Sequence, residues 1–265
     1  MKNILVPISS NENALNTLQY AINFAKQSNA KIYLVHIFSS TKISGSFVKI
    51  DNILERDSKK ILDDLLAKVD RKDVSILRKS LKGHSIVDSI GEFCKIREID
   101  LIITSTKNDE SDKTVFLGEV TGGILKDLSF PVLVIPSSAS FKPIDKILMA
   151  IKSGKIQSEK TLFPVFDIKT IFNSKIDLLQ VKTPLLDEKD LALNTELKNN
   201  ISNLISTKNA TVFQGVLEFL HAADPDIICV IKRKRGFFRK LWQNDTVKKI
   251  DFESNIPLLV LKGIS

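Results

Sequence analysis

The stretch Asn3-Ile-Leu-Val-Pro-Ile8 has a close counterpart later in the chain, Lys146-Ile-Leu-Met-Ala-Ile151. Each is a short run rich in Ile, Leu and Val, which is typical of a parallel strand buried on both faces. Three more pairs follow in the same order: Lys31-Ile-Tyr-Leu-Val-His36 with Lys175-Ile-Asp-Leu-Leu-Gln180, Asp100-Leu-Ile-Ile-Thr104 with Asp226-Ile-Ile-Cys-Val230, and Pro131-Val-Leu-Val-Ile135 with Pro257-Leu-Leu-Val-Leu261. This ordered recurrence predicts a tandem duplication of one strand-rich unit.

Helical patterns separate the apolar runs. Ser9-x-x-Glu12 has the form of a capping box, and apolar residues recur at helical spacing after it. A third strand is expected at residues 74–78. In the second copy the apolar pattern predicts a helix carrying Leu197, Ile201, Leu204 and Ile205.

The alternation of strands and helices predicts an α/β fold of two tandem, doubly wound, open parallel-sheet domains that are Rossmann-like. We expect the first domain at residues 1–138 and the second at 143–265, joined by the Ser/Pro-rich stretch Pro136-Ser-Ser-Ala-Ser-Phe-Lys-Pro143. The matched runs lie closer together after the second strand, so the second copy is shortened.

Composition places the chain among ordinary globular proteins. It has 265 residues, of which 43% are hydrophobic and 26% charged, and it has two cysteines in separate apolar segments. These features predict neither a disulfide framework nor a metal site, and the short apolar run at the N-terminus does not resemble a signal peptide. We expect a cytoplasmic protein without a membrane span. No nucleophile elbow or phosphate-loop lysine motif occurs, so we do not expect an enzyme.

Two copies of a five-stranded unit, the first ending in Phe-Pro-Val-Leu-Val-Ile-Pro136, resemble the universal stress protein family. The resemblance implies a fold like that of the adenine-nucleotide alpha-hydrolases and a role in the stress response. The resemblance rests on residues 4–9, 34–37, Gly83, 100–104, Gly118 and 131–135.

Some members of that family bind ATP through a Gly-x2-Gly-x9-Gly-Ser/Thr motif after the fourth strand. Its glycines let backbone amides approach phosphates at a helix N-terminus. When Gly118 is aligned with the third glycine, the other motif positions are occupied by Ser105, Asn108 and Glu119. Ser9 stands where the family has an acidic residue that contacts the nucleoside, and His36 and Gly83 stand near the implied pocket.

Glu119 argues most strongly against nucleotide binding. A carboxylate in the first turn stabilises an empty helix N-terminus by ~0.3–1 kcal/mol. Its repulsion of a phosphate at 4 Å costs about 1 to 4 kcal/mol per charge pair. We therefore expect no cofactor and favour a protein that acts by binding a protein partner. The alternative is a small-ligand binder that retains AMP, ATP or another anionic metabolite in an altered pocket.

The net charge of +8 is concentrated near the C-terminus, where residues 232–249 contain eight basic residues against one acidic residue. One interpretation is an anion site formed by Arg233, Arg235, Arg239 and Lys240. The favoured interpretation is a solvated loop, so nucleic acid is not an expected partner.

We also expect the two copies to form an intramolecular pseudo-dimer through their last strands, because apolar edge strands invite aggregation. A further homo-oligomer remains open.

Overall fold

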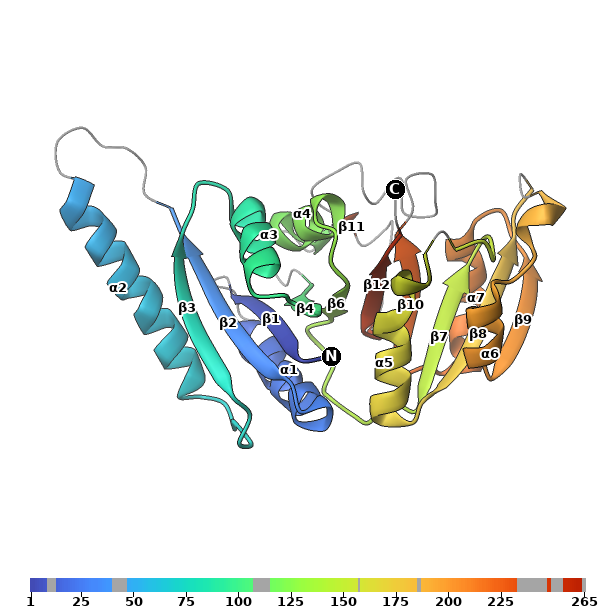
Figure 1. Cartoon of the computed structure of the whole chain (residues 1–265), viewed down its shortest axis with the longest axis horizontal. Helices are drawn as coiled ribbons and strands as arrows, with labels where there is room; N and C mark the ends of the chain where they lie inside the picture. The colour runs from blue at the N-terminus through green and yellow to red at the C-terminus, as the bar shows by residue number, and fades with distance from the viewer. Residues whose placement is uncertain are drawn as a thin grey trace.

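A computed structural model describes residues 1–8, 13–39, 47–106, 115–156, 158–184, 187–232, 247–248 and 255–263. Its centre is a ten-stranded sheet in the order β3-β2-β1-β4-β6-β12-β10-β7-β8-β9, with helices on both faces (Figure 1). This arrangement confirms the predicted α/β class.

The elements of the first half are β1 (Asn3–Ile8), α1 (Ala14–Ser28), β2 (Lys31–Phe38), α2 (Phe47–Leu66), β3 (Ile76–Lys82), α3 (Ile86–Ile96), β4 (Leu101–Ser105), β5 (Val115–Leu117), α4 (Glu119–Asp127) and β6 (Val132–Ile135). Those of the second half are β7 (Lys146–Ile151), η1 (Glu159–Thr161), α5 (Phe163–Phe172), β8 (Lys175–Lys182), η2 (Glu188–Asp190), α6 (Thr195–Asn200), β9 (Asn203–Lys208), α7 (Val212–Ala223), β10 (Ile227–Lys232), β11 (Val247–Lys248) and β12 (Leu258–Lys262).

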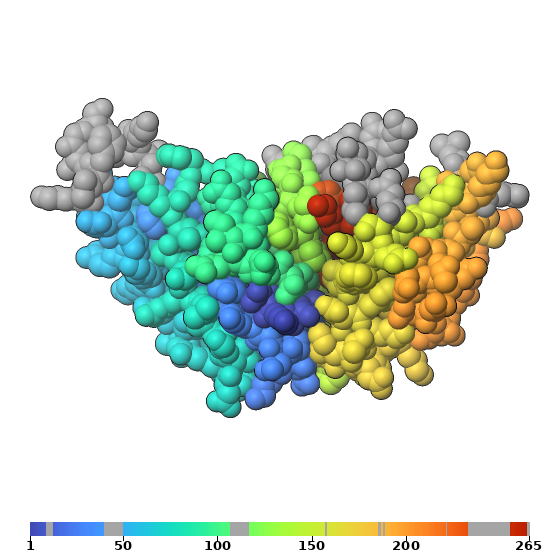
Figure 2. Space-filling view, viewed as in Figure 1, coloured from blue at the N-terminus to red at the C-terminus, as the bar shows by residue number. Residues whose placement is uncertain are grey.

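Both halves have the same strand order. The first half runs β3-β2-β1-β4-β6 from its outer edge to the centre, and the second half runs β9-β8-β7-β10-β12. At the centre β6 and β12 pair antiparallel, with Val134 opposite Leu258 and Val132 opposite Val260. The space-filling view shows the two halves side by side and in contact (Figure 2). The outer edges of the sheet are therefore β3 and β9.

One backbone contact recurs at the start of each half. The Asp100 carboxylate accepts hydrogen bonds from the backbone N–H groups of Lys2 at 2.6 Å and Asn3 at 2.9 Å. The Asp226 carboxylate accepts from the N–H groups of Asp145 at 2.8 Å and Lys146 at 2.9 Å. In each half, the aspartate before the fourth strand therefore fixes the beginning of the first strand.

Apolar side chains fill a core on each face of the sheet. One core is covered by α1, α2, α5 and α6 and includes Phe24, Leu62, Ile168 and Leu197. The other is covered by α3, α4 and α7, where Tyr33 of β2 meets Phe93 of α3 edge to face at 5.6 Å between ring centroids. Each core contains residues from both halves, so we expect the halves to unfold together.

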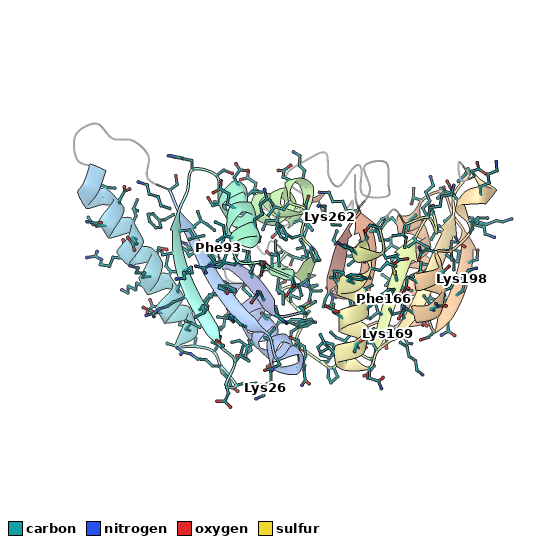
Figure 3. All side chains as sticks on the ribbon, in the orientation of Figure 1. Lys26, Phe93, Phe166, Lys169, Lys198 and Lys262 are labelled. Carbon is teal, nitrogen blue, oxygen red and sulfur yellow. The ribbon has the colours of Figure 1, made fainter. Side chains whose placement is uncertain are left out.

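Figure 3 shows Phe166 and Lys169 on α5 and Lys198 on the neighbouring α6. The Lys169 ammonium donates to the carbonyl of Asn200 at 2.8 Å. A cation thus satisfies the C-terminal end of the short helix α6. This helix has six residues, whereas α2 at the corresponding place in the first half has twenty.

Helix α1 begins at Ala14 with Asn13 as N-cap. Ser9 and Glu12, which form the expected capping box, lie outside the described residues. Two local predictions were wrong. The third strand runs Ile76–Lys82 rather than 74–78, because Lys72 and Asp73 have positive φ and form a turn.

The helix expected to include Leu204 ends at Asn200. Leu204 and Ile205 lie instead in β9, which pairs with β8. A helical spacing of four apolar residues was outweighed by pairing with a buried neighbouring strand.

Candidate functional site

The candidate site lies at the carboxyl ends of β1 and β4. The chain goes outward from β1 to β2 and β3, then returns to the other side of β1 with β4. Such a switch point leaves a crevice outside the strand ends, which is where open α/β sheets bind ligands. Gly83 follows β3 and Ser105 ends β4 on this edge of the first half, whereas His36 lies within β2, opposite Ile8 at the end of β1. Gly118 and Glu119 follow β5, which belongs to a separate two-stranded sheet.

The Asn13 side chain bridges the switch point. Its amide nitrogen donates to the backbone carbonyl of Thr106 at 3.0 Å, and Asn13 is 5% exposed. The bond ties the beginning of α1 to the end of β4. Sequence analysis missed this residue. Its signal was an Asn immediately before the first helical residue, which suggests only a cap.

Two further contacts hold α4 against the end of β4. The Thr121 hydroxyl donates to the carbonyl of Ser105 at 2.9 Å, and the hydroxyls of Thr104 and Thr121 lie 3.0 Å apart. Both threonines are buried. The carbonyl of Ser105, at the first motif position, is therefore already hydrogen-bonded within the protein. The same bond holds the first turn of α4 against the end of β4.

The N-terminus of α4 points to the same strand edge. Gly118 is its N-cap, with extended backbone at φ −75° and ψ 172°, and it has no side chain to accept from the first N–H groups. Glu119 follows in the first turn and is exposed. Its charge is favourable for the helix dipole and opposes an anion at the same place.

A strand from the second half pairs next to Gly118. β5 precedes Gly118 directly, and β11 runs antiparallel to it, with Val247 opposite Leu117 and Lys248 opposite Val115. Sequence reasoning did not predict this pair. The chain after β4 and the chain after β10 thus meet beside the candidate site.

His36 belongs to a buried polar contact away from α4. Its Nδ1 lies 2.8 Å from the Ser58 hydroxyl of α2, and Ser80 of β3 bonds to the same hydroxyl. Burial lowers the pKa of His36, so the neutral imidazole is favoured. The structure places His36 as a side chain that joins α2 to the sheet.

Gly83 follows β3, and its N–H donates to the carbonyl of Phe38 at 3.0 Å. A Cβ at this position would lie 2.0 Å from the Ser89 hydroxyl. The glycine therefore lets the chain approach α3 closely. His36 and Gly83 lie at the β2 and β3 side, whereas Ser105, Gly118 and Glu119 lie together at the end of β4.

The predicted residues Ser9, Asn108, Arg233, Arg235, Arg239 and Lys240 lie outside the described residues. Lys232, at the end of β10, is described, and its ammonium donates to the carbonyl of Lys126 near the end of α4. Burial lowers the pKa of Lys232.

Neither cysteine is placed for chemistry. Burial raises the pKa of Cys94 to about 12 and also raises that of Cys229, so both thiols stay protonated. Among the described residues no cluster of three or more His, Cys, Asp or Glu side chains is arranged to hold a metal ion. Within the same ranges, no helix is long and apolar enough to cross a membrane.

Comparisons with known proteins agree with this geometry. The sequence model of the universal stress protein family matches residues 1–136. A universal stress protein of Methanocaldococcus jannaschii is 26% identical over 139 residues, which cover 51% of this chain and 81% of that protein.

Two solved structures resemble the chain along almost its whole length. The crystal structure of a universal stress protein from Archaeoglobus fulgidus has a TM-score of 0.75 at 17% identity, covering 98% of each chain. A putative universal stress protein from Pseudomonas aeruginosa has a TM-score of 0.61 at 16% identity, covering 99% of this chain and 93% of that one. At these identities the two structures show a shared fold.

Proposed function

The chain belongs to the universal stress protein family, and we propose that it is a stress-response or regulatory protein that acts by binding a partner and does not catalyse a reaction. The proposal includes a cytoplasmic location and a protein partner.

The observation that carries the proposal is the exposed carboxylate of Glu119 at the N-terminus of α4. A phosphate held there would need the first N–H groups of the helix, and it would meet a like charge within the first turn. The repulsion and the lost hydroxyl donor act in the same direction. The residues present do not fit an ATP phosphate chain.

The strand pair β5–β11 supports the same conclusion. In the motif described above, nine residues separate the second glycine from the third, and the glycines let backbone amides approach phosphates. In this chain the three residues before Gly118 form β5, whose backbone pairs with β11. Backbone N–H groups used in strand pairing are not available to an anion.

Equilibrium dialysis with labelled ATP, with and without Mg²⁺, tests the proposal. We expect the native chain to bind no tighter than the high micromolar range. The variant Ser105→Gly, Asn108→Gly, Glu119→Ser restores the motif and should bind more tightly. Glu92→Ser is the matched control, because Glu92 is an exposed glutamate on α3 and is not part of the motif. Tight ATP binding by the native chain would overturn the proposal.

A second candidate is a binder of AMP, ATP or another anionic metabolite. The observation that favours it is the Gly118 N-cap, since a helix that begins at glycine lacks a side-chain cap for its first N–H groups. Dialysis with labelled AMP distinguishes the two candidates. Saturable AMP binding that Glu119→Ser strengthens would support the second candidate in place of the first.

A further inference from the structure

In the second half, a segment of the chain covers the strand ends that correspond to the candidate site of the first half. The turn after β7 contains Ser153, Gly154 and Lys155, and residues 187–194, which we term the strap, follow β8 and precede α6. The Gly154 N–H donates to the carbonyl of Asp190 at 2.8 Å. The Asn194 N–H donates to the carbonyl of Gly154 at 3.2 Å. The middle of the strap and its C-terminal end are therefore both bonded to Gly154.

Side chains add two more ties. The Lys155 ammonium lies 2.7 Å from the Asp190 carboxylate, and the amide of Gln180, which lies in β8 opposite the last residue of β7, donates to the Leu191 carbonyl at 2.9 Å. Gln180 is 5% exposed and Ser153 is 8% exposed. The strap is thus fixed to the carboxyl ends of both β7 and β8.

The approach of the strap to Gly154 leaves no room for a side chain. A Cβ on Gly154 would lie 2.4 Å from the Ala192 carbonyl oxygen and 2.8 Å from the Leu193 Cα. These are backbone atoms, which cannot rotate away as a side chain could. Gly154 is therefore required here by close packing of two backbone segments.

The place where the strap lies corresponds to a binding edge. In the sheet, β7 lies between β8 and β10, just as β1 of the first half lies between β2 and β4. Carboxyl ends of parallel strands next to a switch point are where sheets of this kind bind ligands. We propose that the strap is an intramolecular lid that occupies this edge of the second half.

While the strap is closed, its backbone occupies the strand ends of the second half, where a small molecule would bind. Release of the strap opens this edge. This inference is independent of the proposed function, because it rests on contacts in the second half alone.

Amide hydrogen exchange of the full chain, measured by mass spectrometry, tests the lid. In the native protein, peptides covering residues 153–156 and 187–194 should be protected. Gly154→Ala places a methyl group against the strap backbone, and it should make both peptides exchange about tenfold faster or more. Lys189→Ala is the matched control, because Lys189 is an exposed neighbour of Asp190 within the strap, and it should leave exchange unchanged.

The fluorescent dye 8-anilinonaphthalene-1-sulfonate is the binding probe. Gly154→Ala should bind more dye than the native chain, whereas Lys189→Ala should not. If Gly154→Ala does not fold, the double variant Lys155→Ala, Asp190→Ala removes the exposed ion pair and should increase exchange in the same two peptides. Rapid exchange of the strap in the native chain would overturn the proposal. Equal protection in the native chain and in the folded Gly154 variant would do the same.

Discussion

Replacement of Asp226 should destabilise the whole sheet, because this carboxylate fixes the start of β7. It accepts from the N–H groups of Asp145 and Lys146 and lies 2.6 Å from the Lys142 ammonium. The Asp226 side chain is 12% exposed and that of Lys142 is 62% exposed. The backbone contacts are therefore better shielded from water than the ion pair.

The magnitude follows from these contacts. Hydrogen bonds to a charged acceptor contribute about 1.5 kcal/mol or more each, and the exposed Lys142 pair adds ~0.5 kcal/mol. Asp226→Ala should lower the free energy of unfolding by about 3.5 kcal/mol, which corresponds to a fall of about 7–14 °C in Tm. Asp226→Asn keeps an acceptor oxygen and should cost about half as much. Lys142→Ala should cost no more than about 0.5 kcal/mol.

The pH dependence has a definite sign. Burial alone would raise the pKa of Asp226, but the bonds from Lys142, Lys146 and Asp145 outweigh burial and lower this pKa below its ordinary value. The folded protein then binds fewer protons than the unfolded chain. The stabilisation is present above pH ~4 and is lost as the pH falls through the folded-state pKa.

Urea unfolding followed by circular dichroism measures these differences. We expect one cooperative transition, with the loss for Asp226→Ala several times that for Lys142→Ala. A loss below about 1 kcal/mol for Asp226→Ala, or equal losses for the two variants, would refute the reasoning, since surface ion pairs alone contribute that little.

Three other predictions concern the seam, the histidine and the basic segment. Cysteines at Val134 and Leu258, which are opposite one another in β6 and β12, should form a disulfide within one chain, and a crosslink only between chains would contradict this pairing. Because burial lowers the pKa of His36, stability should fall as the pH drops below ~6.5, and His36→Gln should flatten that fall while His84→Gln, at an exposed position, should not. If the chain binds heparin, changing Arg233, Arg235, Arg239 and Lys240 to Glu should abolish its retention on a heparin column. Changing Lys59, Lys60, Arg71 and Lys72 of the first half to Glu should leave retention intact. Equal losses from the two variants would mean that net charge governs binding.

The strands that carry the fold were predictable because they are apolar on both faces. Leu5 and Leu148 are fully buried, and so are their neighbours in β1 and β7. A buried parallel strand has a strong sequence signal, since few other structures require an unbroken Val, Ile and Leu run. The order of these runs along the chain then restricted the topology to a few choices.

The errors lie where long-range pairing overrides a local pattern. Leu204 and Ile205 have helical spacing with Leu197, yet they lie in β9, which pairs with β8 at the edge of the sheet. Asn13 was not singled out from the sequence, because its amide bonds to Thr106, which is distant in sequence. The β5–β11 pair joins segments from both halves. No local pattern contains such information.

The nucleotide content of the purified chain tests the central claim most directly. The native protein, released by acid and separated by chromatography, should contain no stoichiometric ATP, ADP or AMP, because Glu119 opposes a phosphate at the N-terminus of α4. One nucleotide per chain would contradict the claim that this protein acts without one.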